Sequence, residues 1–479
     1  PRRDGGSMTD PFVVVGGDAA GLSAASKCKR ENPDREVIVF EKDKWVSFAH
    51  CGMPYYIKGE VESQTDMLSL SPEEIEERGI DLRRQYEVTG VDTDDQFVTY
   101  NTRVGKTVRQ KYGDLLIATG ARASAPFEGV DLDGAFTLHH MDSAAAIRAY
   151  LTDPDEDHGI DNEFVDTGLV ERYAGMAAPE SVAIVGGGYV GVEMAEAFHD
   201  HDLDIHLFQR GERVLEPFGE AVGDAVCDRL TEKGITLHLD TEVQRLAGID
   251  SVDAVVTEDG RTEVDCALVG VGVEPNTDVV ASTDVILGDS GAIAIDDFGQ
   301  TSVEGIYAAG DCAEMRHAVT GNYDWVPLGL TANRAGRAIG QTIAGDPEPV
   351  GDIAGTAVVK AFELECGRAG ILDHERAREA GFDPVSETVT AGSRSGYYPG
   401  AEETTVYMTA DRETGQILGG AIVGEDRAAI RIDTLSTALE ANMTVAELER
   451  LDLAYAPPFS PVWDPVLVAA KVLRSTLEA

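Results

Sequence analysis

The sequence predicts an α/β protein in which one strand–turn–helix–strand unit occurs twice and a separate α+β domain follows. The first copy runs from the apolar strand Phe12–Val15 into the glycine turn Gly16–Gly21. The second copy starts with Val182–Val185 and continues into Gly186–Gly191, about 170 residues later. A glycine turn directly after a buried strand, repeated with matching flanks, is typical of two Rossmann-like dinucleotide-binding units. Beyond residue 350, apolar and polar residues alternate, which indicates an antiparallel sheet.

The first unit carries the residues that a nucleotide site of this type needs. Gly16 permits the tight turn, and Gly21 lets the helix pack closely against the strand. Glu41 ends the second strand, twenty residues after Gly21, where a carboxylate can accept both hydroxyl groups of an adenosine ribose. Ala20 completes the predicted cofactor-binding set, in a turn whose helix N-terminus faces a pyrophosphate. Asp18 occupies the middle glycine position, where an acid is unfavourable unless its side chain turns away.

The second unit has all three glycines, but the residue at the end of its second strand is different. That position holds Gln209, followed by Arg210, in place of an acid. Loss of the carboxylate removes the repulsion that a 2′-phosphate would feel, and Arg210 or Arg213 can pair with that phosphate. We therefore expect NAD(P)H at this unit, with NADPH favoured over NADH. The predicted binding residues are Gly186, Gly188, Gly191, Gln209 and Arg210.

The composition limits the compartment and the partners of the protein. The 479 residues include 86 acidic and 39 basic side chains, which give a net charge of −47. This charge opposes binding to nucleic acid or to an anionic membrane, and its spread along the whole chain indicates a halophilic protein. No apolar run is long enough for a membrane span, and the six cysteines lack the paired spacing of a disulfide framework or a zinc site. We expect a cytoplasmic protein without a metal centre.

Shifts in composition predict how the chain divides into domains. A first nucleotide-binding part covers residues 8–150, and the second nucleotide-binding domain covers 151–285. The acidic segment 153–180, with several prolines and glycines, is interpreted as a linker. Residues 286–345 return to the first domain, and an α+β domain covers 350–479. Within this last domain the patterns predict strands at Ala357–Phe362 and Thr404–Met408 and helices at Ile430–Leu439 and Val445–Leu451.

A single cysteine follows the first unit in the segment Ser47–Tyr56, and no other cysteine lies within twenty residues of Cys51. A lone thiol cannot close a disulfide with a near neighbour, so a redox role requires a mixed disulfide or a sulfenic acid. The site must lower the pKa of the Cys51 thiol, because the thiolate is the reactive form. Pro54 suits the first turn of a helix whose free amides would do this, and His50 is a second candidate. We interpret the other five cysteines as packing residues, with Cys312 the one worth watching.

These motifs together resemble the flavin-dependent pyridine nucleotide-disulfide oxidoreductases over nearly the whole chain. The Cys51 segment narrows the resemblance to the single-cysteine branch that holds CoA-disulfide reductases and NADH oxidases. The resemblance implies FAD on the first unit, NAD(P)H on the second, and a C-terminal dimerisation domain that builds a homodimer. Three further motifs carry it: Leu116–Gly120, Gly305–Asp311 and Tyr455–Phe459.

The resemblance also implies site residues at matching positions. Asp311 would accept a hydrogen bond from the FAD ribitol, and Thr119 and Gly120 would bind the same cofactor. The helical stretch Leu328–Ile339 would aim its N-terminus at the flavin, where negative charge collects on reduction. Cys51 would lie against the flavin ring and attack CoA disulfide, so that one CoA leaves as a thiol. Tyrosines of the neighbouring subunit would assist that thiolate, and the matching candidates are Tyr397, Tyr398 and Tyr455.

Three other functions stay open from the sequence. One is an NAD(P)H oxidase or peroxidase in which Cys51 cycles through a sulfenic acid. Enzymes of that kind in this group place a histidine in the first glycine turn, whereas Ala19 stands here, which argues against peroxide chemistry. Another is a persulfide or polysulfide reductase, although no rhodanese-type extension follows the dimerisation motif before Ala479. The last is a non-enzymatic flavin redox sensor, which the complete second unit disfavours.

Overall fold

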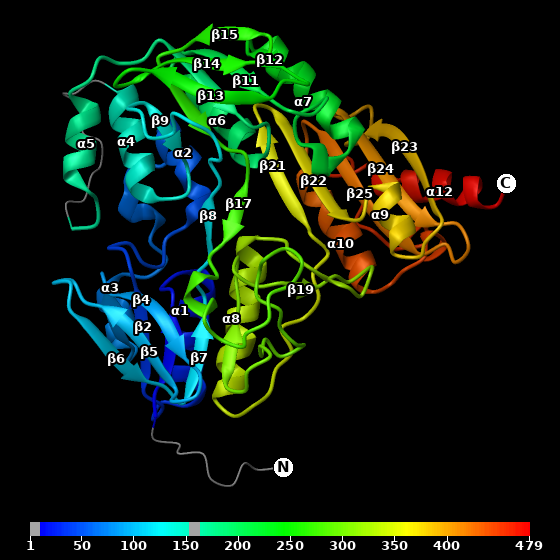
Figure 1. The fold of residues 1–479 in the computed structure, drawn as a ribbon. Helices are drawn as coiled ribbons and strands as arrows, with labels where there is room; N and C mark the ends of the chain where they lie inside the picture. The colour runs from blue at the N-terminus through cyan, green and yellow to red at the C-terminus, as the bar shows by residue number, and fades with distance from the viewer. Residues whose placement is uncertain (1–9, 153–162) are drawn as a thin grey trace.

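The computed structural model describes residues 10–152 and 163–479. Figure 1 shows three bodies: the first unit in blue and cyan, the second unit in green above it, and the C-terminal domain in yellow to red beside them. Each body contains a five-stranded sheet. The predicted α/β fold with two similar units and a C-terminal α+β domain is confirmed.

The first body is a parallel sheet covered by helices. Its elements are β1 (Phe12–Val15), α1 (Ala19–Glu31), β2 (Val37–Glu41), α3 (Pro72–Glu77), β3 (Asp81–Arg84), β4 (Glu87–Asp92), β5 (Phe97–Asn101), β6 (Thr107–Lys111), β7 (Asp114–Ile117), β18 (Ile306–Ala308) and α8 (Gly329–Ile343). The strand order is β18-β7-β1-β2-β3. All of β1 is buried, as expected for a parallel strand that is covered on both faces. The antiparallel strands β4, β5 and β6 form a separate layer that shares this core.

The second body repeats this arrangement. Its elements are β9 (Ala135–Thr137), α4 (Met141–Leu151), α5 (Thr167–Ala174), β10 (Ser181–Val185), α6 (Tyr189–Asp200), β11 (Asp204–Phe208), α7 (Glu220–Glu232), β12 (Thr236–His238), β13 (Val243–Gly248), β14 (Val252–Thr257), β15 (Gly260–Glu263) and β16 (Cys266–Val269). The parallel order is β12-β11-β10-β16-β9, and β13, β14 and β15 form an antiparallel layer. The two predicted strand–turn–helix–strand units correspond to β1-α1-β2 and β10-α6-β11.

A two-stranded ribbon joins the two sheets. It pairs β8 (Ala121–Ala123) with β17 (Val273–Pro275), so the chain leaves the first sheet after β7 and returns to it after β17. β9 pairs with β16, which puts β9 in the second sheet. The predicted boundary between the first and second domains, at residue 150, assigned β9 to the first domain. Because β9 pairs within the second sheet, this boundary lies before β9. β9 has only three residues, too few for a periodic pattern to be read from the sequence.

The acidic segment 153–180 is more than a linker where the structure describes it. Its residues 153–162 lie outside the described ranges, whereas the remainder contains α5. Asp166 caps this helix with its side chain, and Val170 and Tyr173 are buried. The helix packs against α4 (Figure 1). The linker interpretation therefore does not hold for this half of the segment. Its many charged residues obscured the apolar pattern of a short amphipathic helix.

The C-terminal domain is an antiparallel sheet with helices, as predicted. Its strand order is β21-β22-β25-β24-β23. The strands are β21 (Ala357–Ala361), β22 (Leu364–Gly370), β23 (Pro384–Gly392), β24 (Glu403–Asp411) and β25 (Ile417–Gly424), and the helices are α9 (His374–Glu379), α10 (Ile432–Glu440), α11 (Val445–Leu448) and α12 (Pro465–Leu477). The two predicted strands and the first predicted helix agree with β21, β24 and α10 to within two residues, except that β24 continues three residues further. The second predicted helix begins where α11 begins, but α11 ends three residues earlier than predicted.

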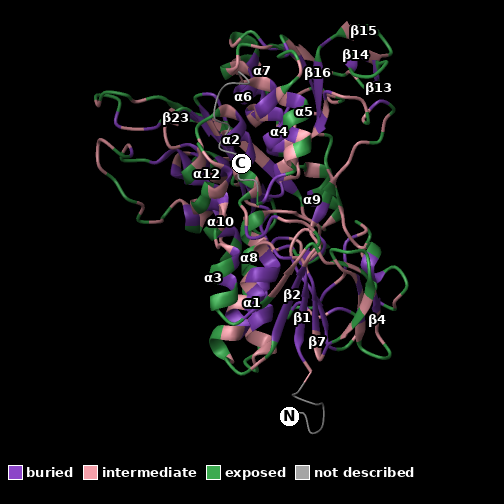
Figure 2. Cartoon of the chain, turned by 90° about the vertical axis from the view of Figure 1, so that its left-hand side faces the viewer, coloured by how far each residue is buried: buried purple, intermediate pink, exposed green. Residues whose placement is uncertain are grey.

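Burial is concentrated in the sheets. Figure 2 shows β1, β2 and β7 in the colour of buried residues, with exposed residues on loops and outer helix faces. Across residues 10–152 and 163–479, no helix has the length and apolarity that a membrane crossing requires. The same residues contain no cluster of three or more His, Cys, Asp or Glu side chains that could hold a metal ion.

Two helices of the first body touch through their backbones. A Cβ added to Gly336 of α8 would lie 2.1 Å from the carbonyl oxygen of Ala20 in α1, and one added to Gly340 would lie 2.3 Å from that of Ala24. Only glycine allows such an approach, because the opposing atoms are backbone and cannot rotate away. The predicted helix Leu328–Ile339 is therefore α8, and glycines set its distance from α1.

Gly336→Ala is expected to lower the free energy of unfolding by about 1–3 kcal/mol, because the added methyl group forces the helices apart. Gly329→Ala is the matched control on the same helix, since a Cβ there meets nothing within 4 Å. Urea unfolding followed by circular dichroism compares the two variants. Equal stabilities would contradict the close approach.

Candidate functional site

Cys51 lies in a short 3-10 helix, η1 (His50–Gly52), directly before α2 (Met53–Lys58), which has Pro54 in its first turn. The predicted helix start after the cysteine is confirmed. Among the described residues, Cys51 is the only exposed cysteine; Cys227 is half-buried, and the other four, including Cys312, are buried. Cys51 therefore presents the thiol that an external molecule can reach.

Backbone hydrogen bonds attach the segment around Cys51 to the first glycine turn. The amide of Ser47 donates to the carbonyl of Gly17 over 3.0 Å, and the amide of Ala49 donates to that of Met67 over 2.9 Å. Ser47 has a φ of 55°, in the left-handed region, so the chain turns sharply as it enters the segment. These contacts place Cys51 beside the turn that is predicted to hold the first nucleotide.

The electrostatic setting of Cys51 is opposite to the expected one. Burial raises the pKa of its thiol, and the carboxylates of Glu193 and Asp311 raise it further. A backbone hydrogen bond lowers this pKa but contributes least. His50 supplies no positive charge, because burial and the neighbouring His139 lower its pKa to about 3. The protein chain alone thus favours the thiol over the thiolate at neutral pH.

A tyrosine and a glutamate near Cys51 are site residues that the sequence did not indicate. Tyr55 lies one helical turn after Cys51, and its hydroxyl donates to a carboxylate oxygen of Glu193 over 3.1 Å. Glu193 belongs to α6, just after the second glycine turn, so this bond joins the two units. Burial raises the pKa of Glu193 to about 7. The charge of Glu193 therefore changes near neutral pH. The only sequence signal for this pair was the four-residue spacing from Cys51 to Tyr55, which places the tyrosine one helical turn after the cysteine.

A second glutamate of α6 binds three parts of the protein together. The carboxylate of Glu196 accepts hydrogen bonds from the ammonium groups of Lys58 and Lys360, each over 2.7 Å, and from the amide of Phe362 over 2.9 Å. Lys58 ends α2, and Lys360 belongs to β21 of the C-terminal domain. The side chains of Lys58 and Glu196 are only 12% and 10% exposed. A buried carboxylate needs such partners to offset its desolvation. These contacts therefore tie α2 to α6 of the second body and to β21 of the C-terminal domain.

The first glycine turn has the geometry of a nucleotide site. Gly16 has a φ of 112°, and a Cβ there would lie 2.0 Å from the carbonyl oxygen of Ala118. A Cβ on Gly21 would lie 1.9 Å from the carbonyl oxygen of Gly16. At the end of β2, the carboxylate of Glu41 accepts a hydrogen bond from the amide of Gly17 over 2.8 Å. The carboxylate is thus held beside the turn, where it can reach the ribose of FAD.

The other residues expected at FAD surround this turn. Asp311 is partly buried, which raises its pKa to about 6, and no group in the described chain donates a hydrogen bond to its carboxylate. It is therefore available to a ribitol hydroxyl. Thr119 instead donates its hydroxyl to the carbonyl of Asn276, and Gly120 turns the chain with a φ of 66°. Ala20 is buried against α8. Together these residues fit FAD, with Glu41 and Asp311 as the acceptors.

The second glycine turn repeats the first with one substitution. Gly186 has a φ of 106°, and a Cβ on Gly191 would lie 1.9 Å from the carbonyl oxygen of Gly186. The amide of Gly187 donates to the side-chain oxygen of Gln209 over 2.9 Å, as Gly17 does to Glu41. A Cβ on Gly188 would meet nothing within 4 Å. The turn thus keeps its geometry while an amide replaces the carboxylate.

Two arginines near Gln209 differ in their availability. Arg213 is bound to Asp224 over 3.0 Å. Arg210 is exposed and forms no ion pair within the described chain. Of the two, Arg210 is therefore the one free to meet a 2′-phosphate.

The three predicted tyrosines lie in the C-terminal domain, and no contact in the described chain joins them to Cys51. Tyr397 and Tyr398 belong to the loop between β23 and β24. The side chains of Tyr397 and Tyr455 are 77% and 49% exposed. The same domain exposes six further large apolar side chains, a composition typical of a protein interface: Val358, Ile430, Phe459, Val462, Trp463 and Val472.

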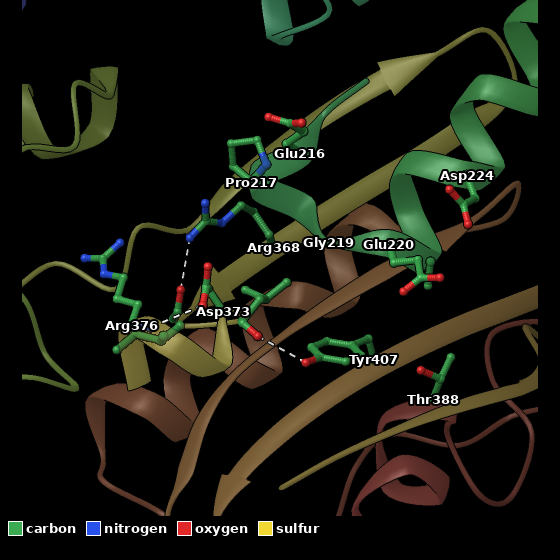
Figure 3. Close-up of a pocket in the computed structure, with 14 residues that line it drawn as sticks. Glu216, Pro217, Gly219, Glu220, Asp224, Arg368, Asp373, Arg376, Thr388 and Tyr407 are labelled. Carbon is green, nitrogen blue, oxygen red and sulfur yellow. Dashed lines mark hydrogen bonds between the residues drawn. The ribbon is translucent and has the colours of Figure 1, made fainter. Parts of the chain in front are cut away.

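A cavity of about 760 Å³ lies apart from these residues, between the start of α7 and the C-terminal domain (Figure 3). Arg368 and Arg376 line one side, and carboxylates such as Glu216 and Glu220 line another. Arg368 donates to the carbonyl of Gly370 over 3.0 Å. None of the predicted site residues lines this cavity, so we do not assign the redox chemistry to it.

Comparison with known proteins identifies the family. The family model for pyridine nucleotide-disulphide oxidoreductases matches residues 10–330, and the dimerisation domain of the same family matches 356–465. The chain belongs to the pyridine nucleotide-disulphide oxidoreductase family, and it is an NAD(P)H-dependent reductase that uses FAD. The family, cofactors and enzyme class expected from the motifs are confirmed.

Relatives of the chain include reductases of sulfur compounds and an NADH oxidase of Methanocaldococcus jannaschii, to which the chain is 31% identical over 96% of its length and 97% of the relative. The chain is 39% identical to the NAD(P)H coenzyme A polysulfide/persulfide reductase of Pyrococcus horikoshii, over 98% of this chain and 100% of the relative. It is 30% identical to the coenzyme A disulfide reductase of Staphylococcus aureus, over 94% and 96%. The solved structure of an NAD-dependent persulfide reductase from A. fulgidus matches with a TM-score of 0.89 and 31% identity, over 98% of this chain and 84% of that chain.

Glu193→Gln is expected to lower the pKa of Cys51, because it removes the charge that raises this pKa most after burial. The thiolate reacts with iodoacetamide, so the alkylation rate of Cys51 at pH 7.5 should rise about 3–10-fold. Mass spectrometry of the Cys51 peptide measures this rate between pH 6 and 9. Glu258→Gln, an exposed position in the second body, is the control and should leave the rate unchanged. An unaltered rate in Glu193→Gln would show that this charge does not reach the thiol.

Proposed function

We propose that the protein reduces the disulfide of coenzyme A with electrons from NADPH. The exposed thiol of Cys51 carries this proposal, because no other cysteine of the described chain is exposed. Such a thiol cannot close an internal disulfide, so its oxidised form is a mixed disulfide with the substrate or a sulfenic acid, and attack on a disulfide substrate gives the former. The 30% identity to a coenzyme A disulfide reductase along nearly the whole chain supports the same substrate.

The sulfur chemistry balances in two steps. The Cys51 thiolate attacks one sulfur of CoA disulfide, the substrate S–S bond breaks, and one CoA leaves as a thiolate that takes up a proton. Two electrons then break the bond between Cys51 and the retained CoA, which restores the Cys51 thiolate and releases the second CoA as a thiol after it takes up a proton. FAD, held by Glu41 and Asp311, would supply this electron pair when bound, with NADPH as the hydride donor.

Tyrosines of the second subunit would assist the departing thiolate. Tyr397, Tyr398 and Tyr455 do not contact Cys51 of their own chain, so they can act on it only across a dimer. A phenol hydroxyl donates a hydrogen bond to a sulfur anion. The dimerisation domain and its exposed apolar side chains support a shared site of this kind.

The second unit supports NADPH over NADH. Gln209 takes the place of the acid that would repel a 2′-phosphate, and Arg210 is unpaired within the described chain. A charge-assisted hydrogen bond from a guanidinium group to a phosphate is worth more than one to a ribose hydroxyl. We therefore assign cofactor preference to these two residues.

A persulfide or polysulfide is the second candidate substrate. The relative with 39% identity is named a coenzyme A polysulfide/persulfide reductase, and its whole length aligns with this chain. The same attack by Cys51 on a sulfur–sulfur bond would serve either substrate. An oxidase is less supported, because Ala19 offers no acid or base for peroxide, and a redox sensor would not need a complete second glycine turn.

Cys51→Ser is expected to abolish NADPH oxidation by CoA disulfide, by at least about 10³-fold, while FAD stays bound, because the hydroxyl cannot form a mixed disulfide. Initial rates in molar salt with CoA disulfide, CoA persulfide or oxygen as acceptor measure this loss. Cys227→Ser, at the half-buried cysteine, is the control and should retain the parent rate. A Cys51→Ser enzyme with the parent rate would exclude the mechanism.

Mass spectrometry of the isolated protein under non-reducing conditions separates the candidates. A CoA adduct on Cys51 supports CoA disulfide reduction, and an added sulfur atom supports the persulfide reaction. A sulfenic or sulfinic acid on Cys51 points to the oxidase and would count against both sulfur substrates.

Arg210→Ala is expected to lower kcat/KM for NADPH about 10-fold and to leave kcat/KM for NADH unchanged, because only the 2′-phosphate loses a partner. Steady-state rates with each nicotinamide measure the change. Arg261→Ala removes an exposed arginine elsewhere in the second body and should alter neither value. A parent enzyme with a large preference for NADH would refute the assignment.

A further inference from the structure

Asp18 is an acid at the point where the first glycine turn must approach a pyrophosphate. It precedes α1 directly and lies between Gly17 and Ala19. Its side chain makes none of the usual capping hydrogen bonds to α1, although the backbone of Ala19, the first residue of the helix, favours its charged form. An ionised carboxylate here would repel the cofactor that the rest of the turn is built to hold. The position of Asp18 is therefore compatible with bound FAD only if its charge is neutralised or its side chain turns away from the pyrophosphate.

The side chain of Asp18 turns towards the segment that carries the redox cysteine. Its Oδ2 atom lies 3.2 Å from Nδ1 of His50, the residue before Cys51. The His50 ring stacks on Phe48 with 3.9 Å between ring centroids and lies 5.6 Å from the ring of His139. The contact adds a side-chain link to the backbone bonds between this segment and the glycine turn.

The groups that face Asp18 disfavour its charged form. Burial raises its pKa, and Glu41 from β2 and Asp311 after β18 raise it further, to about 8, although backbone hydrogen bonds at Phe48 and Ala19 lower it. No lysine or arginine of the described chain forms an ion pair with it. The anionic pyrophosphate of FAD adds negative charge to the same place, which also favours the neutral acid.

The groups that face His50 favour its neutral form. Burial and the neighbouring His139 and His140 lower its pKa to about 3. His140 is itself bound to Asp43 over 3.2 Å, and that contact raises the pKa of His140. These pKa shifts favour a neutral carboxylic acid on Asp18 beside a neutral imidazole on His50, one of whose ring nitrogens can accept a hydrogen bond.

We propose that Asp18 works as a neutral carboxylic acid that donates its proton to Nδ1 of His50, so that the glycine turn binds the redox segment and tolerates the FAD pyrophosphate at once. No covalent bond forms or breaks in this role. The inference depends on FAD binding alone and is independent of which sulfur compound Cys51 reduces. It makes Asp18 a positioning residue whose charge controls how tightly FAD is held.

The direction of the pH effect follows from the raised pKa. Below about pH 8 the acid is neutral, so the proposed proton on its carboxyl group is present, 3.2 Å from Nδ1 of His50. As the pH rises through the pKa of the folded, FAD-bound protein, Asp18 ionises beside Glu41, Asp311 and the pyrophosphate. FAD binding therefore weakens as the pH rises. The dissociation constant rises by up to tenfold for each pH unit between the pKa of Asp18 in the free site and its higher pKa in the FAD-bound site.

The test measures FAD release from the FAD-bound protein in molar salt between pH 6.5 and 10, by the fluorescence of free flavin. The dissociation constant of the parent protein should rise at least 10-fold from pH 7 to pH 10. Asp18→Asn, whose amide donates to His50 without ionising, should change less than twofold over this range. Asp94→Asn removes an exposed carboxylate far along the sequence and should keep the rise of the parent.

A second variant guards against an asparagine that fails to fold. Asp18→Gly restores the common residue of the turn and should also bind FAD independently of pH, but it should lose the link to His50. Proteolysis of the Ser47–Tyr56 segment should then be faster than in Asp18→Asn. A flat parent profile, or an equal rise in the parent and in both Asp18 variants, would overturn the proposal. Neither readout uses a sulfur substrate, so failure here is distinct from failure of the proposed reaction.

Discussion

The close backbone approach at the first glycine turn is the constraint on which the rest of the site depends. The chain at Gly16 lies so near the carbonyl of Ala118 that no side chain fits between β1 and β7. On the other side of β1, pairing with β2 places the end of β2 beside the turn, where the carboxylate of Glu41 accepts a hydrogen bond from the amide of Gly17. The carbonyl of Gly17 in turn binds the amide of Ser47 and so sets the path towards Cys51. One residue thus contacts both the nucleotide carboxylate and the redox segment.

The two units show how one geometry serves two cofactors. Both turns use a glycine with positive φ, and both bond an amide of the turn to the side chain at the end of the second strand. The difference is electrostatic, because Glu41 is acidic and Gln209 is neutral. The two turns therefore share one backbone shape, and the proposed choice between NADPH and NADH rests on the charge of one side chain.

Local patterns in the sequence were sufficient for the elements that depend on neighbouring residues. The strands β1, β2, β10 and β11 and the helix after Cys51 follow from apolar runs, glycines and a proline. The three-residue strand β9 could not be read, because its place in the second sheet comes from pairing with β16, far along the chain. Charge hid α5, whose two buried residues lie among acidic ones.

The chemistry of the site was harder to predict than its position. The expected low pKa of Cys51 rested on a helix start, whereas Glu193 and Asp311 act on the thiol from distant parts of the sequence. The partnership of Asp18 with His50 was equally invisible, since a turn and a later loop meet only in the fold. The role of the candidate tyrosines stays a prediction, because within the described chain they make no contact with Cys51.

The hydrogen bonds of Glu196 connect the helix after Cys51 to the second body and to the C-terminal domain. Lys58 at the end of that helix shares the carboxylate of Glu196 with Lys360 from the C-terminal domain. The C-terminal domain is therefore connected, through Glu196 and Lys58, to the end of the six-residue helix that follows Cys51. One buried carboxylate thus links the dimerisation domain to the helix that directly follows the redox cysteine.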